Sequence, residues 1–197
     1  MGGRAGLGGT VTERPPLERP EVGRERVSSR VIVNTGDGKG KTSAAMGVVM
    51  RAVARGWRVV VVQFVKDGRW KTGEETSARA LGAEWWSLGD GFTWDSDDIE
   101  ETEGVAREAW RAARDLIRAG QHELVVLDEI TYPITWGWID GEEVAATIRD
   151  RPSQVNIVAT GRDAPEPLRG VADTVTEMTN VKHAFDAGVG AMRGIEF

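Results

Sequence analysis

The sequence contains no cysteine. Disulfide bonds, thiolate metal centres, iron–sulfur clusters and cysteine nucleophiles are therefore all excluded, and the composition fits the reducing cytoplasm, where we expect the protein to act. Histidine is almost as scarce, because His122 and His183 are the only two in the chain. A lone histidine is more often structural than catalytic, so the sequence assigns neither of them a catalytic role.

Long apolar runs and an excess of positive charge are also missing. No apolar run is long enough to span a bilayer, and the start of the chain, Met1 to Gly6, lacks the apolar core of a signal peptide. The formal net charge is −6, whereas proteins that bind nucleic acid backbones need clusters of Lys and Arg. We therefore expect neither a membrane nor a nucleic acid as partner, while a small anionic ligand remains compatible.

Length and composition predict one folded domain. A chain of 197 residues with 40% hydrophobic content can bury one α/β core and leaves no room for a second full domain. Residues 1–28 are rich in Gly, Pro, Arg and Glu and offer almost nothing to bury. We predict a flexible N-terminal arm over 1–28 and the folded domain over 29–197.

The most informative stretch is a glycine-rich turn that ends in Gly-Lys-Thr. An apolar run at Arg30–Asn34 precedes it and a segment with helical spacing at Thr42–Arg55 follows, which is the strand, loop and helix context of a phosphate-binding P-loop. The residues that we predict to bind ATP here are Thr35, Gly36, Asp37, Gly38, Lys39, Gly40, Lys41, Thr42 and Ser43.

Each residue type in this loop has a chemical reason to be there. Glycines let backbone N–H groups turn inward, the Lys41 ammonium reaches the terminal phosphates, and the Thr42 hydroxyl ligates Mg²⁺. Thr35 departs from the general pattern, because it stands where G-x-x-x-x-G-K-[ST] has its first glycine. We expect Gly36 and Gly38 to compensate for it.

A second apolar run supplies acidic groups for the same site. The run from Glu123 to Leu127 ends in Asp128 and Glu129. Asp128 is predicted to hold the metal ion, directly or through water, and Glu129 either shares that role or orients a bound group. Mg²⁺ is the expected ion, and Mn²⁺ fits the same oxygen-rich shell. Arg162, which follows a third apolar run, is predicted to reach a phosphate.

Apolar strands alternate with helical segments along the domain. Strands are predicted at Arg30–Asn34, Trp57–Phe64, Ala83–Leu88, Leu124–Leu127, Gln154–Ala159 and Thr174–Glu177. Helices are predicted at Thr42–Arg55, from Ser96 or Asp97 to Ala119, at Gly141–Arg149 and at Pro165–Val171. This order predicts an α/β protein with a RecA-like P-loop NTPase fold, in which a mostly parallel sheet carries helices on both faces and binds ligands at its carboxyl edge.

Several further motifs, together with the P-loop, resemble those of the P-loop ATP:corrinoid adenosyltransferases, over about Arg24 to Phe197. They are Q-F at Gln63–Phe64, G-E at Gly73–Glu74, G-F-T-W at Gly91–Trp94, V-V-L-D-E at Val125–Glu129 and T-G-R at Thr160–Arg162. The most specific is the tail VKHAFDAGV at Val181–Val189, which closes with G-I-E-F at Gly194–Phe197.

The resemblance implies a reaction and an acceptor. The 5′-deoxyadenosyl group of ATP passes to the Co(I) of a reduced corrinoid, and triphosphate is released, in adenosylcobalamin biosynthesis or salvage. Phe92 and Trp94 are implied to lie against the lower face of the corrin, where they ease reduction of Co(II), and they join Lys41 and Thr42 as catalytic residues. The resemblance also implies a homodimer, in which the arm covers the neighbouring site, and an electron donor such as a reductase or flavodoxin.

Two other functions remain open from sequence. A RecA-like ATPase or kinase with another acceptor predicts steady release of ADP and phosphate, and an ATP-dependent corrinoid carrier or chaperone predicts binding without turnover. The aromatic residues also leave alternatives, since Phe92 and Trp94 either contact a flat ligand or fill the core, and Trp136 or Trp138 either packs in the core or lines the corrin site.

Overall fold

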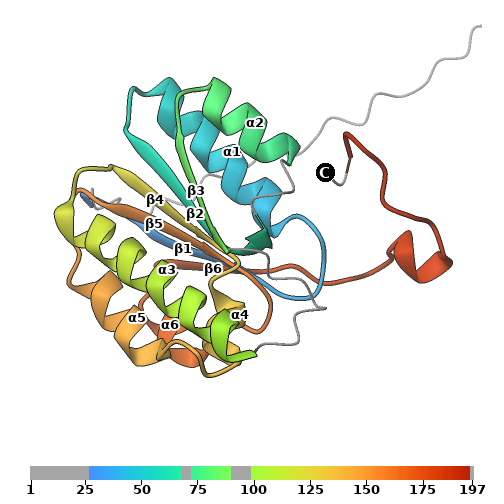
Figure 1. Cartoon of the computed structure of the whole chain (residues 1–197). Helices are drawn as coiled ribbons and strands as arrows, with labels where there is room; N and C mark the ends of the chain where they lie inside the picture. The colour runs from blue at the N-terminus through green and yellow to red at the C-terminus, as the bar shows by residue number, and fades with distance from the viewer. Residues whose placement is uncertain (1–26, 68–71, 90–98, 196–197) are drawn as a thin grey trace, which may run out of the picture.

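The computed structural model describes residues 27–67, 72–89 and 99–195, and these contain a 6-stranded sheet (Figure 1). The strands are β1 Val31–Thr35, β2 Val59–Asp67, β3 Glu84–Gly89, β4 Leu124–Asp128, β5 Asn156–Thr160 and β6 Thr174–Glu177. Their order is β3-β2-β4-β5-β1-β6, and each pair of neighbours is parallel. The parallel α/β sheet predicted from the sequence is therefore confirmed.

Helices follow the strands in the predicted alternation. They are α1 Lys41–Ala54, α2 Gly73–Ala80, α3 Ile99–Ala119, α4 Thr131–Thr135, α5 Gly141–Arg149 and α6 Glu166–Gly170, with a 3-10 turn at η1 Phe185–Ala187. The short elements α2, α4 and η1 were not predicted, and the predicted start of α3 at Ser96 or Asp97 lies outside the described residues. Within the described ranges, no helix is both long and apolar enough to cross a bilayer.

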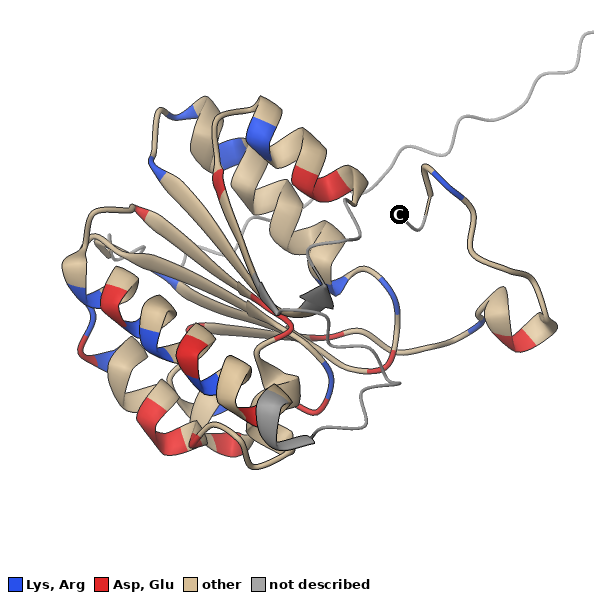
Figure 2. Ribbon diagram, viewed as in Figure 1, with Lys and Arg blue, Asp and Glu red and all other residues tan. Residues whose placement is uncertain are grey.

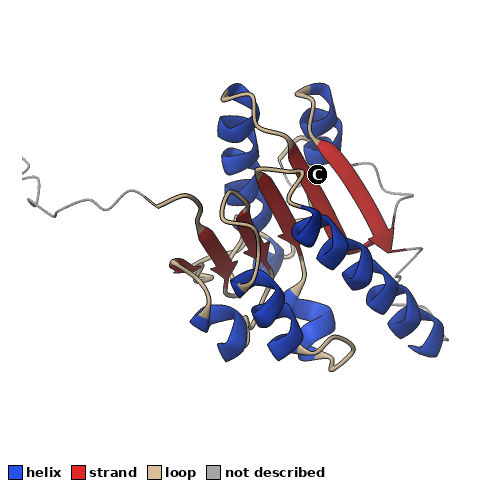
Figure 3. Ribbon diagram, turned by 90° about the vertical axis from the view of Figure 1, so that its left-hand side faces the viewer, coloured by secondary structure: helices blue, strands red, loops and turns tan. Residues whose placement is uncertain are grey.

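Helices cover both faces of the sheet, as predicted (Figure 3). In β2, Val59 and Val61 pack with buried residues of α1 and α2, whereas Val60 and Val62 pack with those of α3, α5 and α6. Full burial of one such side chain contributes on the order of 1.5 kcal/mol, which is why both faces of a covered strand are apolar. Charged residues are frequent along the helices α3 and α5, while the middle strands carry almost none (Figure 2).

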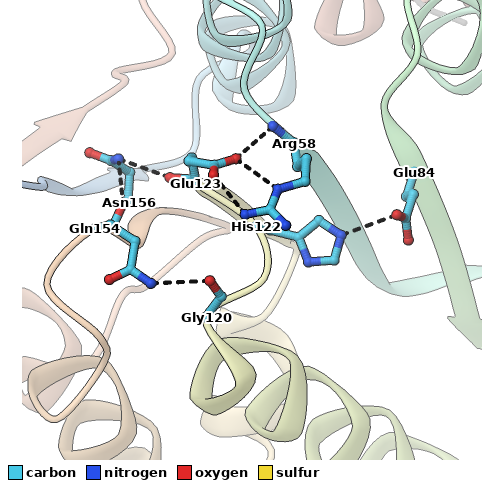
Figure 4. A network of polar contacts seen from close by, with 7 residues as sticks. All are labelled: Arg58, Glu84, Gly120, His122, Glu123, Gln154 and Asn156. Atoms are coloured by element: carbon cyan, nitrogen blue, oxygen red, sulfur yellow. Dashed lines mark hydrogen bonds and ion pairs between the residues drawn. The ribbon is translucent and has the colours of Figure 1, made fainter.

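Two predicted strand starts are wrong, and each has a local reason. β2 begins at Val59, because the side chain of Trp57 is 40% exposed and the backbone N–H of Arg58 donates to the Glu123 carboxylate rather than to a ladder partner. β5 begins at Asn156, because Val155 N–H closes a turn onto the carbonyl of Pro152. The contact between Arg58 and Glu123 belongs to the amino edge of the sheet (Figure 4).

The segment after β6, residues 178–195, has little regular structure and is called the tail below. Figure 1 shows it running out from the body of the domain in red before it returns toward α2. Its apolar side chains are exposed, with Val181 at 91%, Phe185 at 74% and Ile195 at 76%. The start of the tail nevertheless lies directly on the P-loop, since Gly38 N–H donates to the carbonyl of Met178 at 2.7 Å.

Candidate active site

The predicted P-loop lies between the end of β1 and the start of α1. Gly36 and Gly40 have φ angles of 96° and 110°, which only glycine adopts readily, so the chain turns sharply before the helix. Gly40 is the N-cap of α1 and offers no side-chain cap to the first turn of the helix. The free N–H groups of that turn and the helix dipole therefore favour an anion at this position.

The Lys41 side chain folds back over the loop that precedes it. Its ammonium Nζ donates hydrogen bonds to the carbonyls of Gly36 at 2.6 Å and Gly38 at 2.7 Å. This geometry places the positive charge across the mouth of the turn, where a phosphate bound by the loop would also lie.

Several charged groups surround this ammonium. Burial and the neighbouring Arg162 guanidinium lower the pKa of Lys41, while Asp37 and Glu129 act in the opposite direction. Arg162 also forms an ion pair with Asp37, with Nε and Oδ1 3.8 Å apart. The structure thus brings together Asp37, Lys41, Glu129 and Arg162, which the sequence had assigned to one site from three separate segments.

Asp128 is fully buried, and neutral donors hold its carboxylate. Thr42 Oγ1 donates to Oδ1 at 3.0 Å and Thr160 Oγ1 donates to the same oxygen at 2.7 Å, while Gln63 Nε2 donates to Oδ2 at 3.0 Å. Hydrogen bonds to a charged acceptor are stronger than those between neutral groups. The carboxylate is therefore fixed in orientation next to the last residues of the P-loop.

Glu129 has a different environment from its neighbour. It is partly exposed, and its backbone φ of 64° lies in the left-handed region that disfavours residues with a side chain. This conformation costs on the order of 1–2 kcal/mol. The Glu129 N–H donates to Thr160 Oγ1 at 2.9 Å, so Thr160 holds both carboxylate-bearing residues in place.

The donor set fits a metal ion that arrives with its ligand. Thr42 and Asp128 present only oxygen atoms, which suits Mg²⁺ or Mn²⁺. Among residues 27–67, 72–89 and 99–195, no group of three or more His, Cys, Asp or Glu side chains is placed to hold an ion. A hard divalent cation at Thr42 and Asp128 would therefore need further oxygen ligands from a triphosphate and water.

Thr35 explains the departure from the general P-loop pattern. Its side chain is buried, with 2% exposed, and its hydroxyl accepts a hydrogen bond from the N–H of Ala164 at 3.0 Å. This contact ties the P-loop to the segment after β5 that carries Arg162. The sequence predicted that Thr35 binds ATP, and the structure shows its hydroxyl engaged in a contact inside the protein.

The glycines at positions 36 and 38 are required by the tail. A Cβ atom on Gly36 would lie 2.4 Å from the carbonyl oxygen of Met178, and one on Gly38 would lie 2.7 Å from that of Thr179. Both distances are far below van der Waals contact. Close approach of the tail backbone therefore excludes any side chain at these two positions.

The other residues that the sequence assigned to the site do not lie together in the described structure. Ser43 is exposed on α1 and lines a groove between α1 and α2. Phe92 and Trp94 lie outside the described residues. Trp136 and Trp138 are half-buried, with ring centroids 4.7 Å apart. Their assignment to a corrin site stays a prediction.

Sequence reasoning missed two of the three residues that hold the Asp128 carboxylate. Gln63 and Thr160 appeared only as parts of family motifs, yet both are buried and bind its carboxylate. Each is a polar residue at the carboxyl end of an otherwise apolar strand run. That pattern is a usable signal, because parallel strands bring their carboxyl ends to one edge.

Comparison with known proteins identifies the family. The model of the ATP:corrinoid adenosyltransferase BtuR/CobO/CobP family matches residues 28–197. The chain belongs to this family. The adenosyltransferase resemblance seen in the motifs is thereby confirmed.

Curated relatives of this adenosyltransferase family agree over most of the chain. The corrinoid adenosyltransferase of Escherichia coli K12 is 40% identical over 190 residues, which cover 91% of this chain and 96% of that protein. The Pseudomonas aeruginosa corrinoid adenosyltransferase is 43% identical over 169 residues, covering 85% and 83%. That of Sinorhizobium sp. is 42% identical over 171 residues, covering 85% and 79%.

Proposed function

We propose that this protein transfers the 5′-deoxyadenosyl group of ATP to the Co(I) of a reduced corrinoid and releases triphosphate. Family membership supports the reaction class, with ATP as the adenosyl donor and a corrinoid as the acceptor. One structural observation supports the location of the reaction at the P-loop. Lys41 folds over this loop, and Thr42 at its end donates a hydrogen bond to the buried Asp128. The carrier and the ATPase or kinase alternatives are not favoured by this membership.

The reaction is a nucleophilic displacement at carbon. The electron pair of Co(I) attacks C5′ of the ribose, a Co–C bond forms, and the C5′–O bond breaks with its pair remaining on the triphosphate. Co(I) is itself a strong nucleophile, so the protein supplies no general base. Its work is to align cobalt with C5′ and to stabilise charge on the leaving triphosphate.

The P-loop side chains suit the second of these tasks. The Lys41 ammonium and the N–H groups at the start of α1 are fixed before the reaction, so they stabilise new negative charge without reorganising. Arg162 adds a guanidinium at the same edge. We assign the triphosphate to these three groups.

We further propose that Thr42 and Asp128 hold Mg²⁺ or Mn²⁺, with Glu129 close enough to act through water. A divalent ion bound with ATP neutralises part of the triphosphate charge and so makes it a better leaving group. Asp128 accepts two hydrogen bonds on Oδ1 and one on Oδ2, so Oδ2 keeps a lone pair for the ion itself or for a water that the ion holds.

Other parts of the proposal concern features beyond the described residues. Phe92 and Trp94 are assigned to the lower corrin face, where a dry apolar surface preserves Co(I). The homodimer, the cytoplasmic location and an electron donor such as a reductase or flavodoxin belong to the same proposal.

The test is a defined reaction of the purified chain with ATP, Mg²⁺ and chemically reduced cob(I)alamin. The expected result is a light-sensitive adenosyl–cobalt species in the visible spectrum, with triphosphate as the phosphate product. The Lys41→Ala variant serves as the control that ties the reaction to the P-loop. Steady release of ADP and phosphate without a cobalt–carbon bond would overturn the proposal.

A further inference from the structure

The tail forms one wall of a cavity above the P-loop. The cavity has a volume of about 330 Å³ and is lined from the P-loop side by Asp37, Lys39 and Arg162. Asn180 and His183 line it from the tail, and His183 also lines a second cavity, of about 350 Å³, beside Gly38 and Lys39. His183 thus faces the two hollows that border the phosphate-binding turn.

The position of this wall is fixed by backbone contacts. Met178 N–H donates to the carbonyl of Thr35 at 2.8 Å, and Gly38 N–H donates to the carbonyl of Met178 at 2.7 Å. Farther along, Asn180 Nδ2 donates to Asp186 Oδ2 at 3.1 Å and closes the turn that carries His183. The imidazole is therefore held over the P-loop by the fold.

The orientation of the His183 ring is also set. Its Nδ1 accepts a hydrogen bond from the N–H of Phe185 at 3.0 Å, and the two rings meet edge to face with centroids 6.4 Å apart. A neutral imidazole that accepts at Nδ1 carries its proton on Nε2. The ring is partly buried, while its neighbours Lys182 and Ala184 are exposed. Nε2–H is therefore a fixed hydrogen-bond donor.

The cavity gives this donor access to phosphate oxygens. Its lining carries two cations, Lys39 and Arg162, and two carboxylates, of which Asp37 pairs with Arg162 and Asp186 accepts the hydrogen bond from Asn180. The ammonium and guanidinium groups are strong donors to phosphate. Triphosphate leaves the reaction with more negative charge than ATP carried, so a donor from the tail adds to those of the P-loop. A donor outside the P-loop also makes binding depend on where the tail lies.

We propose that His183 is a substrate-binding residue whose Nε2–H donates to the triphosphate of ATP, closing the phosphate site from the tail side. This inference rests on the proposed function for the identity of the ligand. It assigns a role to a residue to which the sequence gave none, and it makes the tail part of the active site.

The direct test measures binding of inorganic tripolyphosphate with Mg²⁺ to the full chain by calorimetry, without corrinoid. His183→Ala is expected to weaken binding about 10-fold or more, the effect of losing one hydrogen bond to a charged group. His183→Gln is expected to retain part of the affinity, because its amide N–H is also a donor. The matched control is His122→Gln, at the amino edge of the sheet, which is expected to bind like the parent.

A second measurement uses the parent protein and so does not depend on how variants fold. With ¹⁵N-labelled histidine, only His122 and His183 contribute imidazole signals. Adding tripolyphosphate is expected to shift the Nε2 resonance of His183 and to leave that of His122 in place. Unchanged affinity in His183→Ala, or an unmoved His183 resonance at saturation, overturns the inference.

The two proposals fail in different ways. If the parent binds tripolyphosphate but forms no cobalt–carbon bond, the transferase proposal fails while the histidine result still stands. If adenosyl transfer proceeds and His183→Ala leaves both tripolyphosphate binding and the KM for ATP unchanged, the transferase stands and the role of His183 is rejected.

Discussion

The two ends of the same strands carry polar networks of opposite character. At the amino edge, Glu123 before β4 binds the backbone N–H of Arg58 at 2.7 Å and its guanidinium at 2.8 Å, and the Glu123 carbonyl accepts from Asn156 Nδ2 (Figure 4). At the carboxyl edge, Asp128 at the end of β4 is fully buried and bound by neutral donors from three other segments.

The two carboxylates differ in the charge of their partners. The carboxylate of Glu123 forms an ion pair with the exposed guanidinium of Arg58. Such an exposed pair adds little to stability beyond joining adjacent strands. The carboxylate of Asp128 is held by hydroxyl and amide donors, and no cation is among its hydrogen-bond partners in the described part of the chain. A carboxylate fixed in this way suits the metal ion that we propose for this edge, whereas Glu123 is already paired with a cation. We therefore assign the ligand to the carboxyl edge, while the contacts at the amino edge join neighbouring strands.

The largest effect on this contrast is expected from Lys41→Ala. Loss of the ammonium removes charge stabilisation from the leaving triphosphate, so kcat/KM for adenosyl transfer should fall about 10²–10³-fold or more. The unfolding midpoint should change little, because the hydrogen bonds of this ammonium within the described ranges go to two carbonyls of the adjoining loop, those of Gly36 and Gly38. Transfer assays and thermal unfolding measure the two quantities. A large drop in the midpoint would make Lys41 structural instead.

Asp128→Asn separates the charge of this residue from its packing. The new amide N–H₂ meets the donor Nε2 of Gln63, so we expect destabilisation of about 1–3 kcal/mol together with roughly 10²-fold lower kcat/KM. Adding Gln63→Glu supplies an acceptor for that amide. The double variant should regain most of the unfolding midpoint but little activity, and recovery of both would show that the exact position of the charge is unimportant.

Gly38→Ala tests whether the tail and the P-loop act as one unit. A Cβ at this position would lie 2.7 Å from the carbonyl oxygen of Thr179, so one of the two segments must move. We expect the KM for ATP to rise about 10-fold, a loss of the size produced by one charged hydrogen bond. The matched control is Gly47→Ala on α1, where nothing lies within 4 Å of the added Cβ. Equal behaviour of both variants would argue against coupling.

The smallest effect is expected at the amino edge. Hydrogen bonds from Arg58 lower the pKa of Glu123 from 4.5 to about 2. Because the pKa is lower in the folded state, this contribution is fully present above pH 4.5 and is lost as the pH falls through about 2. Glu123→Gln should therefore lower the unfolding midpoint slightly at pH 7 and by less at pH 2, with transfer activity unchanged at neutral pH. A pH series of thermal unfolding measures it, and an activity loss would contradict the division between the edges.

The local elements of the fold were largely predictable. Apolar runs such as Val59–Phe64 and Leu124–Leu127 indicate buried parallel strands because their side chains must be covered on both faces. Strand starts were less accurate, since the Arg58 N–H donates to the distant Glu123 carboxylate and the Val155 N–H closes a turn onto Pro152. The short helices α2 and α4 were missed because one or two turns give too little periodicity to detect.

Residue types and their spacing along the chain were enough to predict the chemistry of the site. The P-loop spacing around Lys41 and the pair Asp128 and Glu129 are local patterns whose donors and acceptors follow from residue type. Family motifs then gave the acceptor, and the family comparison confirmed the resemblance.

The residues that join the predicted ones at this edge became visible through contacts between distant segments. Thr160 meets Asp128 across 32 positions, Ala164 meets Thr35 across 129, and Met178 lies on Gly38. The fold also brings His183 beside the P-loop, although the sequence gave no reason to expect a hydrogen-bond donor there. The reason is physical: periodicity and spacing report contacts along one element, whereas these contacts join segments that meet only when the sheet closes and its carboxyl ends converge.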